Sequence, residues 1–97
     1  LNNFIFNDSY DHWFPGGDAD DPVLYLRRGE VYKFNVTSPR HGFSILDSAS
    51  GTQFNIGVTN NGDSNGTITF KVPMTAPSTL YYADSTGGVL GNVINIV

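Results

Sequence analysis

The strongest constraint on the fold of this chain is an alternation of apolar and polar residues at every second position. It is clearest over residues 67–72, where the apolar residues are Ile68, Phe70 and Val72 and the polar ones are Thr67, Thr69 and Lys71. Side chains two positions apart lie on the same face of an extended strand. Residues 67–72 are therefore predicted to form a strand with one buried and one solvated face, as is typical of antiparallel sheets.

Other segments carry the same signal between frequent turn residues. Residues 31–37 place Tyr32, Phe34 and Val36 on one face. Further strands are expected at residues 4–6, 23–26, 43–46, 54–56, 80–83 and 92–97, and loops or turns at residues 10–22, 28–30 and 60–66. No segment has the period of an amphipathic helix of useful length. About seven or eight short strands predict an all-β sandwich of two sheets.

Length and composition fit one domain over residues 1–97, with room for a single core. Because the chain has no cysteine, apolar packing alone must form that core, with seven Phe, five Tyr and one Trp as its largest side chains. The chain begins at Leu1 without an initiator methionine. We therefore expect a processed product or a fragment of a larger polypeptide.

The charge distribution argues against nucleic acid as a partner. The formal net charge is −4, and five aspartates precede the first basic residue, Arg27. Phosphate binding needs a clustered basic face, whereas this chain has only five Lys and Arg residues. No apolar run approaches the roughly 20 residues that span a bilayer, and no signal peptide is recognisable. We predict neither nucleic-acid binding nor a membrane span.

Residues 80–94 have the outline of a metal-binding loop. They resemble the cupredoxin signature Y-Y-x-C-x-x-H-x-x-M-G-x-[IV], with Asp84 at the cysteine position, Gly87 at the histidine and Leu90 at the methionine. A blue-copper site needs a thiolate and two imidazoles, with a weak axial thioether. The resemblance therefore implies the fold of the family without its copper chemistry, and no cofactor is predicted.

Three further segments extend this resemblance to plastocyanin- and azurin-type domains. Residues 21–36 resemble the early strand pair, residues 41–45 resemble the H-x-F-x-I segment with the first copper histidine at His41, and residues 66–82 resemble the last long strand and its approach to the metal loop. The resemblance implies a cupredoxin-like Greek-key β-sandwich. It also implies that Asp84 lies close to His41, and we hypothesise that this pair holds two strand ends together.

The residues suggest no catalytic site. There is no nucleophile elbow, no zinc-type spacing of His and Glu, and no Gly-rich phosphate loop that opens a helix. The acidic segment with Asp18, Asp20 and Asp21 is a candidate for Ca²⁺, which prefers several oxygen ligands, although it lacks the EF-hand spacing. The alternative is a solvated loop in which an Asp caps the turn before Pro22.

A cluster of ring side chains precedes Pro15, and it consists of Tyr10, His12, Trp13 and Phe14. Aromatic residues in an exposed loop can stack on sugars or anchor a protein partner, because they bury a large area at low entropic cost. Alternatively, this loop folds back and closes one end of the small core. Burial of Trp13 would distinguish these two interpretations.

The sequence therefore predicts a non-catalytic structural or interaction module. The expected setting is an extracellular or virion-surface assembly, such as a secreted multidomain protein, a filament, or a phage capsid or tail component. Its partners would be copies of itself or other subunits, paired through the strand at residues 4–6 or the C-terminal strand, whichever lies at a sheet edge. The alternative is a carbohydrate- or calcium-dependent binding module that uses Trp13, Phe14 and the acidic loop.

Overall fold

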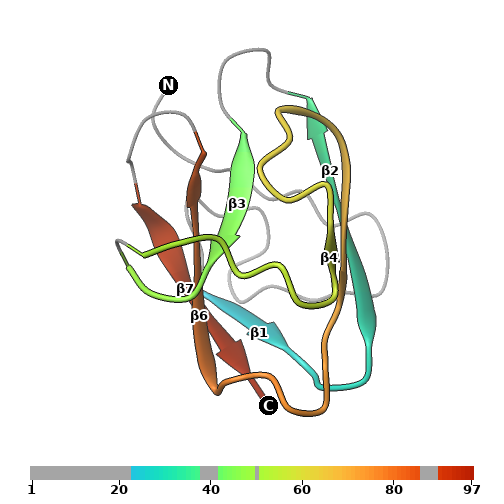
Figure 1. Ribbon diagram of the computed structural model, residues 1–97, viewed down its shortest axis with the longest axis vertical. Coiled ribbons are helices and arrows are strands. Elements are labelled where there is room, and N and C mark those ends of the chain that lie inside the picture. Colours follow the sequence, from blue (N-terminus) through green and yellow to red (C-terminus); the bar gives the residue numbers. More distant parts are fainter. Residues whose placement is uncertain (1–22, 38–41, 50, 86–89) are drawn as a thin grey trace.

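The computed structural model describes residues 23–37, 42–49, 51–85 and 90–97. Within these residues the chain forms seven β-strands and no helix, which confirms the all-β prediction for this part of the chain (Figure 1). No helix that could cross a membrane is therefore found there. The strands are β1 (Leu24–Leu26), β2 (Val31–Thr37), β3 (Phe43–Leu46), β4 (Val58–Thr59), β5 (Asn65–Lys71), β6 (Thr79–Asp84) and β7 (Leu90–Ile96).

The strands form two sheets, as predicted. One sheet has four strands in the order β1-β7-β6-β3, and the other has three in the order β2-β5-β4. β1 and β7 pair in parallel, whereas the other neighbours are antiparallel. The cupredoxin-like Greek-key connectivity stays a prediction.

The buried core lies between the two sheets and follows the alternation in the sequence. On β5 and just after it, Ile68, Phe70 and Val72 have 1% or less of their surface exposed. Three side chains of β2 pack partly buried against this core, and they are Tyr32, Phe34 and Val36. The four-stranded sheet contributes Leu24, Leu26, Phe43, Ile45, Leu80, Tyr82, Ile94 and Ile96. The period of two thus identified the buried faces correctly.

The turn predicted at residues 28–30 is confirmed, and it ties the two sheets together. The backbone N–H of Gly29 donates to Val72 O, at 2.9 Å. The guanidinium of Arg28 donates to the carbonyl oxygens of Ala76, at 2.8 Å, and Ile96, at 3.4 Å. One side chain therefore binds two backbone acceptors that lie far apart in the sequence.

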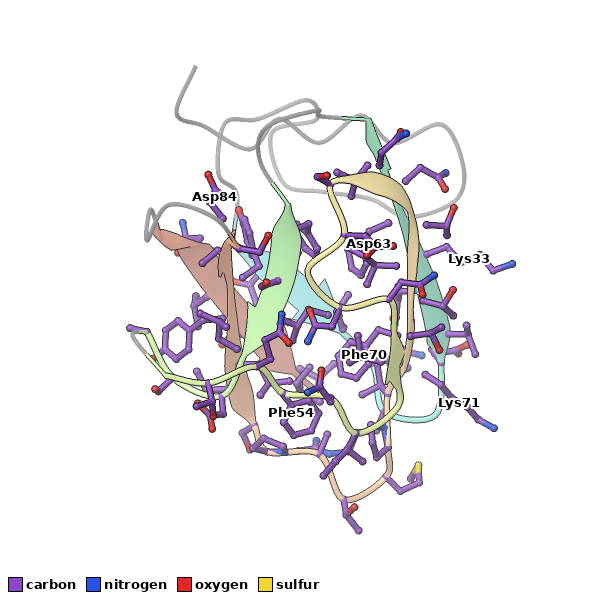
Figure 2. All side chains as sticks on the ribbon, turned by 45° about the horizontal axis from the view of Figure 1, so that its top comes forward. Lys33, Phe54, Asp63, Phe70, Lys71 and Asp84 are labelled. Carbon is purple, nitrogen blue, oxygen red and sulfur yellow. The ribbon has the colours of Figure 1, made fainter. Side chains whose placement is uncertain are left out.

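One expectation from the sequence is wrong. Residues 54–56 are not a strand, because Phe54 instead turns its ring toward Phe70 in an edge contact with a centroid distance of 6.1 Å (Figure 2). The short strand of this region is β4, which begins at Val58. Of the two strands named as possible edge strands, the C-terminal one is internal, since β7 lies between β1 and β6. The expected strand at residues 4–6 lies outside the described residues.

Candidate functional site

The end of the sandwich where β3 begins and β6 ends is the place to which the metal-loop resemblance points. Asp84, the last residue of β6, is the register partner of Phe43, the first residue of β3. Its side chain is half-buried, and Figure 2 shows it at the end of the four-stranded sheet. Of the four positions compared with copper ligands, Asp84 is the one whose side chain the structure describes.

The other three positions cannot be placed in the same way. His41 and Gly87 lie outside the described residues, and Leu90 is described only as the first backbone position of β7. The proposed contact between His41 and Asp84 therefore stays a prediction. The candidate calcium residues Asp18, Asp20 and Asp21 and the ring cluster of Tyr10, His12, Trp13 and Phe14 also lie outside the described residues.

Backbone hydrogen bonds join three chain segments beside Asp84. Ser85 N donates to Gly42 O, at 3.1 Å, and the Ser85 hydroxyl donates to Gly62 O, at 2.9 Å. Phe43 N donates to Asp63 O, at 3.1 Å, and Gly62 N donates to Phe43 O, at 2.9 Å. We call these five residues, Gly42, Phe43, Gly62, Asp63 and Ser85, the Ser85 junction. It holds the start of β3 between the end of β6 and the loop before β5.

The Ser85 junction is too tightly packed for a side chain at its centre. A Cβ atom at Gly42 would overlap the Ser85 hydroxyl and the carbonyl of Gly62. Glycine is required there because two backbones approach each other closely. The donors and acceptors of the junction are used in joining the segments. Among the residues that the structure describes, no group of three or more His, Cys, Asp or Glu is placed to hold a metal ion.

An aromatic stack that includes Phe43 of this junction connects the two sheets. The rings of Phe34 and Phe43 have centroids 4.8 Å apart, and those of Phe43 and Tyr82 are 5.4 Å apart. Tyr82 in turn lies against Gly91, where a Cβ would overlap two atoms of its ring. A bulge between Tyr82 and Ala83 shifts the register of β6 and β7 beside this contact. The tyrosine ring thus covers a glycine on the neighbouring strand.

Asn61 is a structural residue that no sequence pattern singled out. β3 is the outer strand of its sheet, and the Asn61 side chain pairs with it as a strand would. Ile45 N donates to Asn61 Oδ1, at 2.8 Å, and Asn61 Nδ2 donates to Ile45 O, at 3.1 Å. Nδ2 also donates to Phe54 O, at 3.0 Å, and to Asn55 Oδ1, at 3.1 Å. The Asn-Gly sequence indicated only a turn.

Backbone hydrogen bonds from the same loop protect more of the outer edge of β3. Asp47 N donates to Thr52 O, and Phe54 N donates to Ile45 O, at 3.0 and 2.8 Å. Together with the Ser85 junction, the loop between β3 and β5 therefore occupies the outer edge of β3. A covered edge does not offer free backbone groups for pairing with another chain.

Four large apolar side chains are exposed among the described residues near the turn at Arg28. Their exposed fractions are 47% for Val31, 67% for Ile56, 73% for Met74 and 61% for Val97. We call these four residues the apolar end. In Figure 1 the turn between β1 and β2 and the connection between β5 and β6 meet at the lower end of the molecule.

Contacts around the end of β5 bring these residues into one region. Val31 is the register partner of Lys71, whose N–H donates to the carbonyl of Gly57, next to Ile56. A Cβ at Gly29 would lie 3.4 Å from the Met74 sulfur. Val97 joins from the other sheet, because its carbonyl accepts from Arg28 N at 2.9 Å. Exposed apolar residues that gather in one region indicate an interaction surface, whereas scattered ones are normal on any protein.

The sequence matches no protein-family model, and comparisons with curated proteins and with solved structures find no match. Function is therefore inferred from the geometry of the Ser85 junction and from the exposed surfaces of the two sheets.

Proposed function

We propose that this chain is a non-catalytic, copper-free, cupredoxin-like module that binds protein partners in an extracellular or virion-surface assembly. Its partners are copies of itself or other subunits of that assembly. The observation that carries the proposal is the apolar end, where Val31, Ile56, Met74 and Val97 are exposed near one another. Burying such side chains against a partner is favourable because it removes apolar surface from water.

The copper-free part of the proposal is supported by the residues at the family's metal position. Asp84 stands where the cupredoxin signature has a cysteine, and the chain contains no cysteine elsewhere. A carboxylate is a hard ligand and does not replace the thiolate of a blue-copper site. Beside Asp84, the Ser85 junction joins three segments by hydrogen bonds between backbone groups and a hydroxyl. This end of the sandwich serves to connect strands.

The protein-binding part of the proposal is supported by composition. Charged residues make up only 14% of the chain. Specific interfaces between proteins are depleted of charge at their centres and enriched in aromatic residues and Met. Met74, the single methionine of the chain, is also the most exposed of the large apolar side chains in the described residues. The apolar end thus has the character of an interface centre.

Sedimentation velocity over a range of concentrations tests self-association. We expect the wild-type chain to form a larger species as its concentration rises, and the double variant I56K/M74K to remain monomeric. The matched control is N35K/T59K, which adds the same two charges at exposed positions on β2 and β4 and should associate as the wild type does. A wild-type chain that stays monomeric at its highest soluble concentration would contradict association between copies.

A further inference from the structure

The neighbours Asn61 and Gly62 are two residues that the fold needs for different reasons. Asn61 covers the outer edge of β3 with its side-chain amide. Gly62 has a φ of 95°, in the left-handed region that favours glycine, and a Cβ there would lie 2.7 Å from Gln53 Nε2. Gly62 N also donates to Phe43 O, at 2.9 Å, within the Ser85 junction. The attachment of the loop to β3 therefore depends on this pair of residues.

The same pair is chemically labile in water. An asparagine followed by glycine loses its side-chain amide readily, because glycine has no Cβ to hinder attack by its own backbone nitrogen. The Gly62 nitrogen loses its proton and forms a bond to Cγ of Asn61. The bond from Cγ to Nδ2 breaks, and Nδ2 takes up a proton and leaves as ammonia. Water then opens the resulting succinimide at either carbonyl, which gives aspartate or isoaspartate.

The folded structure holds both reacting groups. Asn61 Oδ1 accepts from Ile45 N, and Nδ2 donates to three acceptors. Ring closure makes Cγ tetrahedral and takes Nδ2 out of the amide plane, so these hydrogen bonds must be released first. The attacking N–H of Gly62 is held by Phe43 O, and a bonded N–H loses its proton less readily. The reaction therefore requires the loop to open away from β3.

Loss of the amide prevents the loop from closing as before. Nδ2 donates to the carbonyls of Ile45 and Phe54, whereas an ionised carboxylate has no donor to offer them. Isoaspartate also lengthens the backbone by one carbon, which displaces Gly62 from its contact with Phe43. Both products thus oppose closure, and the reaction turns a transient opening into a permanent one.

We propose that Asn61 is a site of spontaneous deamidation whose rate is controlled by the loop over β3. The closed loop protects the amide, and each opening exposes it to water. Conversion then leaves the outer edge of β3 uncovered. The site needs no partner and does not involve the apolar end. The inference therefore goes beyond the proposed protein-binding function and does not depend on it.

A second Asn-Gly pair in the same chain provides an internal comparison. Asn65 and Gly66 stand at the start of β5, and the Asn65 side chain is exposed. The end of a strand opens at lower cost than contacts with a fully buried residue such as Ile45. Folding should therefore slow deamidation more at Asn61 than at Asn65. In the unfolded chain the two pairs should react at similar rates.

Timed incubation of the full chain at mildly alkaline pH, in buffer and in concentrated urea, tests the proposal. Tandem mass spectrometry of proteolytic peptides quantifies the two sites separately. We expect Asn61 to react at least about tenfold more slowly in buffer than in urea, and Asn65 to be slowed less. N55A removes one acceptor of Asn61 Nδ2, so it should raise the Asn61 rate in buffer by up to about fivefold and leave the rate in urea unchanged. The matched control K33A removes an exposed side chain of β2 and should change neither rate.

The effect of the product is measured in the variant Asn65→Gln, in which Asn61 is the one asparagine that precedes a glycine. Anion exchange separates the deamidated form, because it carries an additional negative charge. Its Ile45 amide should exchange faster than that of the unmodified variant, and its unfolding midpoint should be lower.

Three results would overturn the proposal. The first is an Asn61 that reacts as fast in buffer as in urea, or does not react in urea. The second is an Asn65 that folding slows as much as Asn61. The third is a deamidated form that matches the unmodified variant in exchange at Ile45 and in unfolding midpoint.

Discussion

Replacing Asn61 by alanine should destabilise the fold far more than a half-buried loop asparagine ordinarily would. The Asn61 amide accepts from Ile45 N and donates to the carbonyls of Ile45 and Phe54. Ile45 is fully buried, so its N–H loses a partner that water cannot easily replace, whereas its C=O keeps Phe54 N as a donor. Each such hydrogen bond contributes about 1 kcal/mol net, and a buried group left unsatisfied costs about 1–3 kcal/mol. We expect N61A to lower the free energy of unfolding by about 2–4 kcal/mol.

This loss is large for a domain of 97 residues, whose total stability is about 5–15 kcal/mol. Since 1 kcal/mol shifts the midpoint of a small domain by about 4–8 °C, N61A should lower the melting temperature by at least about 8 °C. Urea denaturation gives the free energy, and hydrogen exchange at Ile45 should become faster in N61A than in the wild type. The control N55A removes one exposed partner of the Asn61 amide and should cost about 1 kcal/mol or less.

The variant N61D distinguishes hydrogen bonding from packing, because it keeps the shape of the side chain. One carboxylate oxygen can still accept from Ile45 N, but the other faces the carbonyls of Ile45 and Phe54 in place of a donor. Repulsion there raises the folded-state pKa of the new aspartate above its unfolded value of about 3.9. The unfolded state then binds fewer protons, so the deficit relative to wild type is smallest below about pH 3.9 and grows as pH rises through the folded pKa.

The reasoning is refuted if N61A costs less than about 1 kcal/mol, or if N61D matches the wild type at pH 7. Either result would mean that the edge of β3 does not depend on the Asn61 amide.

Two further substitutions test the packing of the sandwich, each by thermal and urea unfolding. G91A places a Cβ against the ring of the fully buried Tyr82, and this overpacking should lower the free energy of unfolding by about 1–3 kcal/mol. An unchanged unfolding midpoint would show that the Tyr82 ring does not lie against Gly91. R28A removes the donors to Ala76 O and Ile96 O and should lower the free energy of unfolding by about 1–3 kcal/mol. The control R27A changes an exposed neighbouring position and should alter it by no more than about 0.5 kcal/mol. Equal effects of the two substitutions would contradict the role given to Arg28.

Local periodicity predicted most of the strands, because it indicates which side chains can lie together on a buried face. The strands at residues 31–37 and 43–46 have the predicted bounds, and those predicted at 67–72, 80–83 and 92–97 are displaced or lengthened by one or two residues at their ends. The pattern failed at residues 54–56, where Phe54 anchors a loop on Phe70 instead of forming a strand. One partly buried ring does not distinguish a strand from an anchored loop.

The candidate site was predictable only in outline. The resemblance over residues 80–94 pointed to the end of β6, and Asp84 does pair there with the start of β3. Gly42, Gly62 and Ser85 could not be singled out, because their close approach depends on three segments that are far apart in the sequence. The amide of Asn61 likewise has its role only because the edge of β3 lies beside it.

The sequence by itself determined that the chain is β-structured, which faces are buried, and that no thiolate exists to bind copper. Only the tertiary structure decided the order of the strands, the internal position of β7 and the position of the loop over the outer edge of β3. The reason is physical. A side chain's face follows from its own strand, whereas its neighbours across a sheet follow from register between distant segments, which a local pattern does not record.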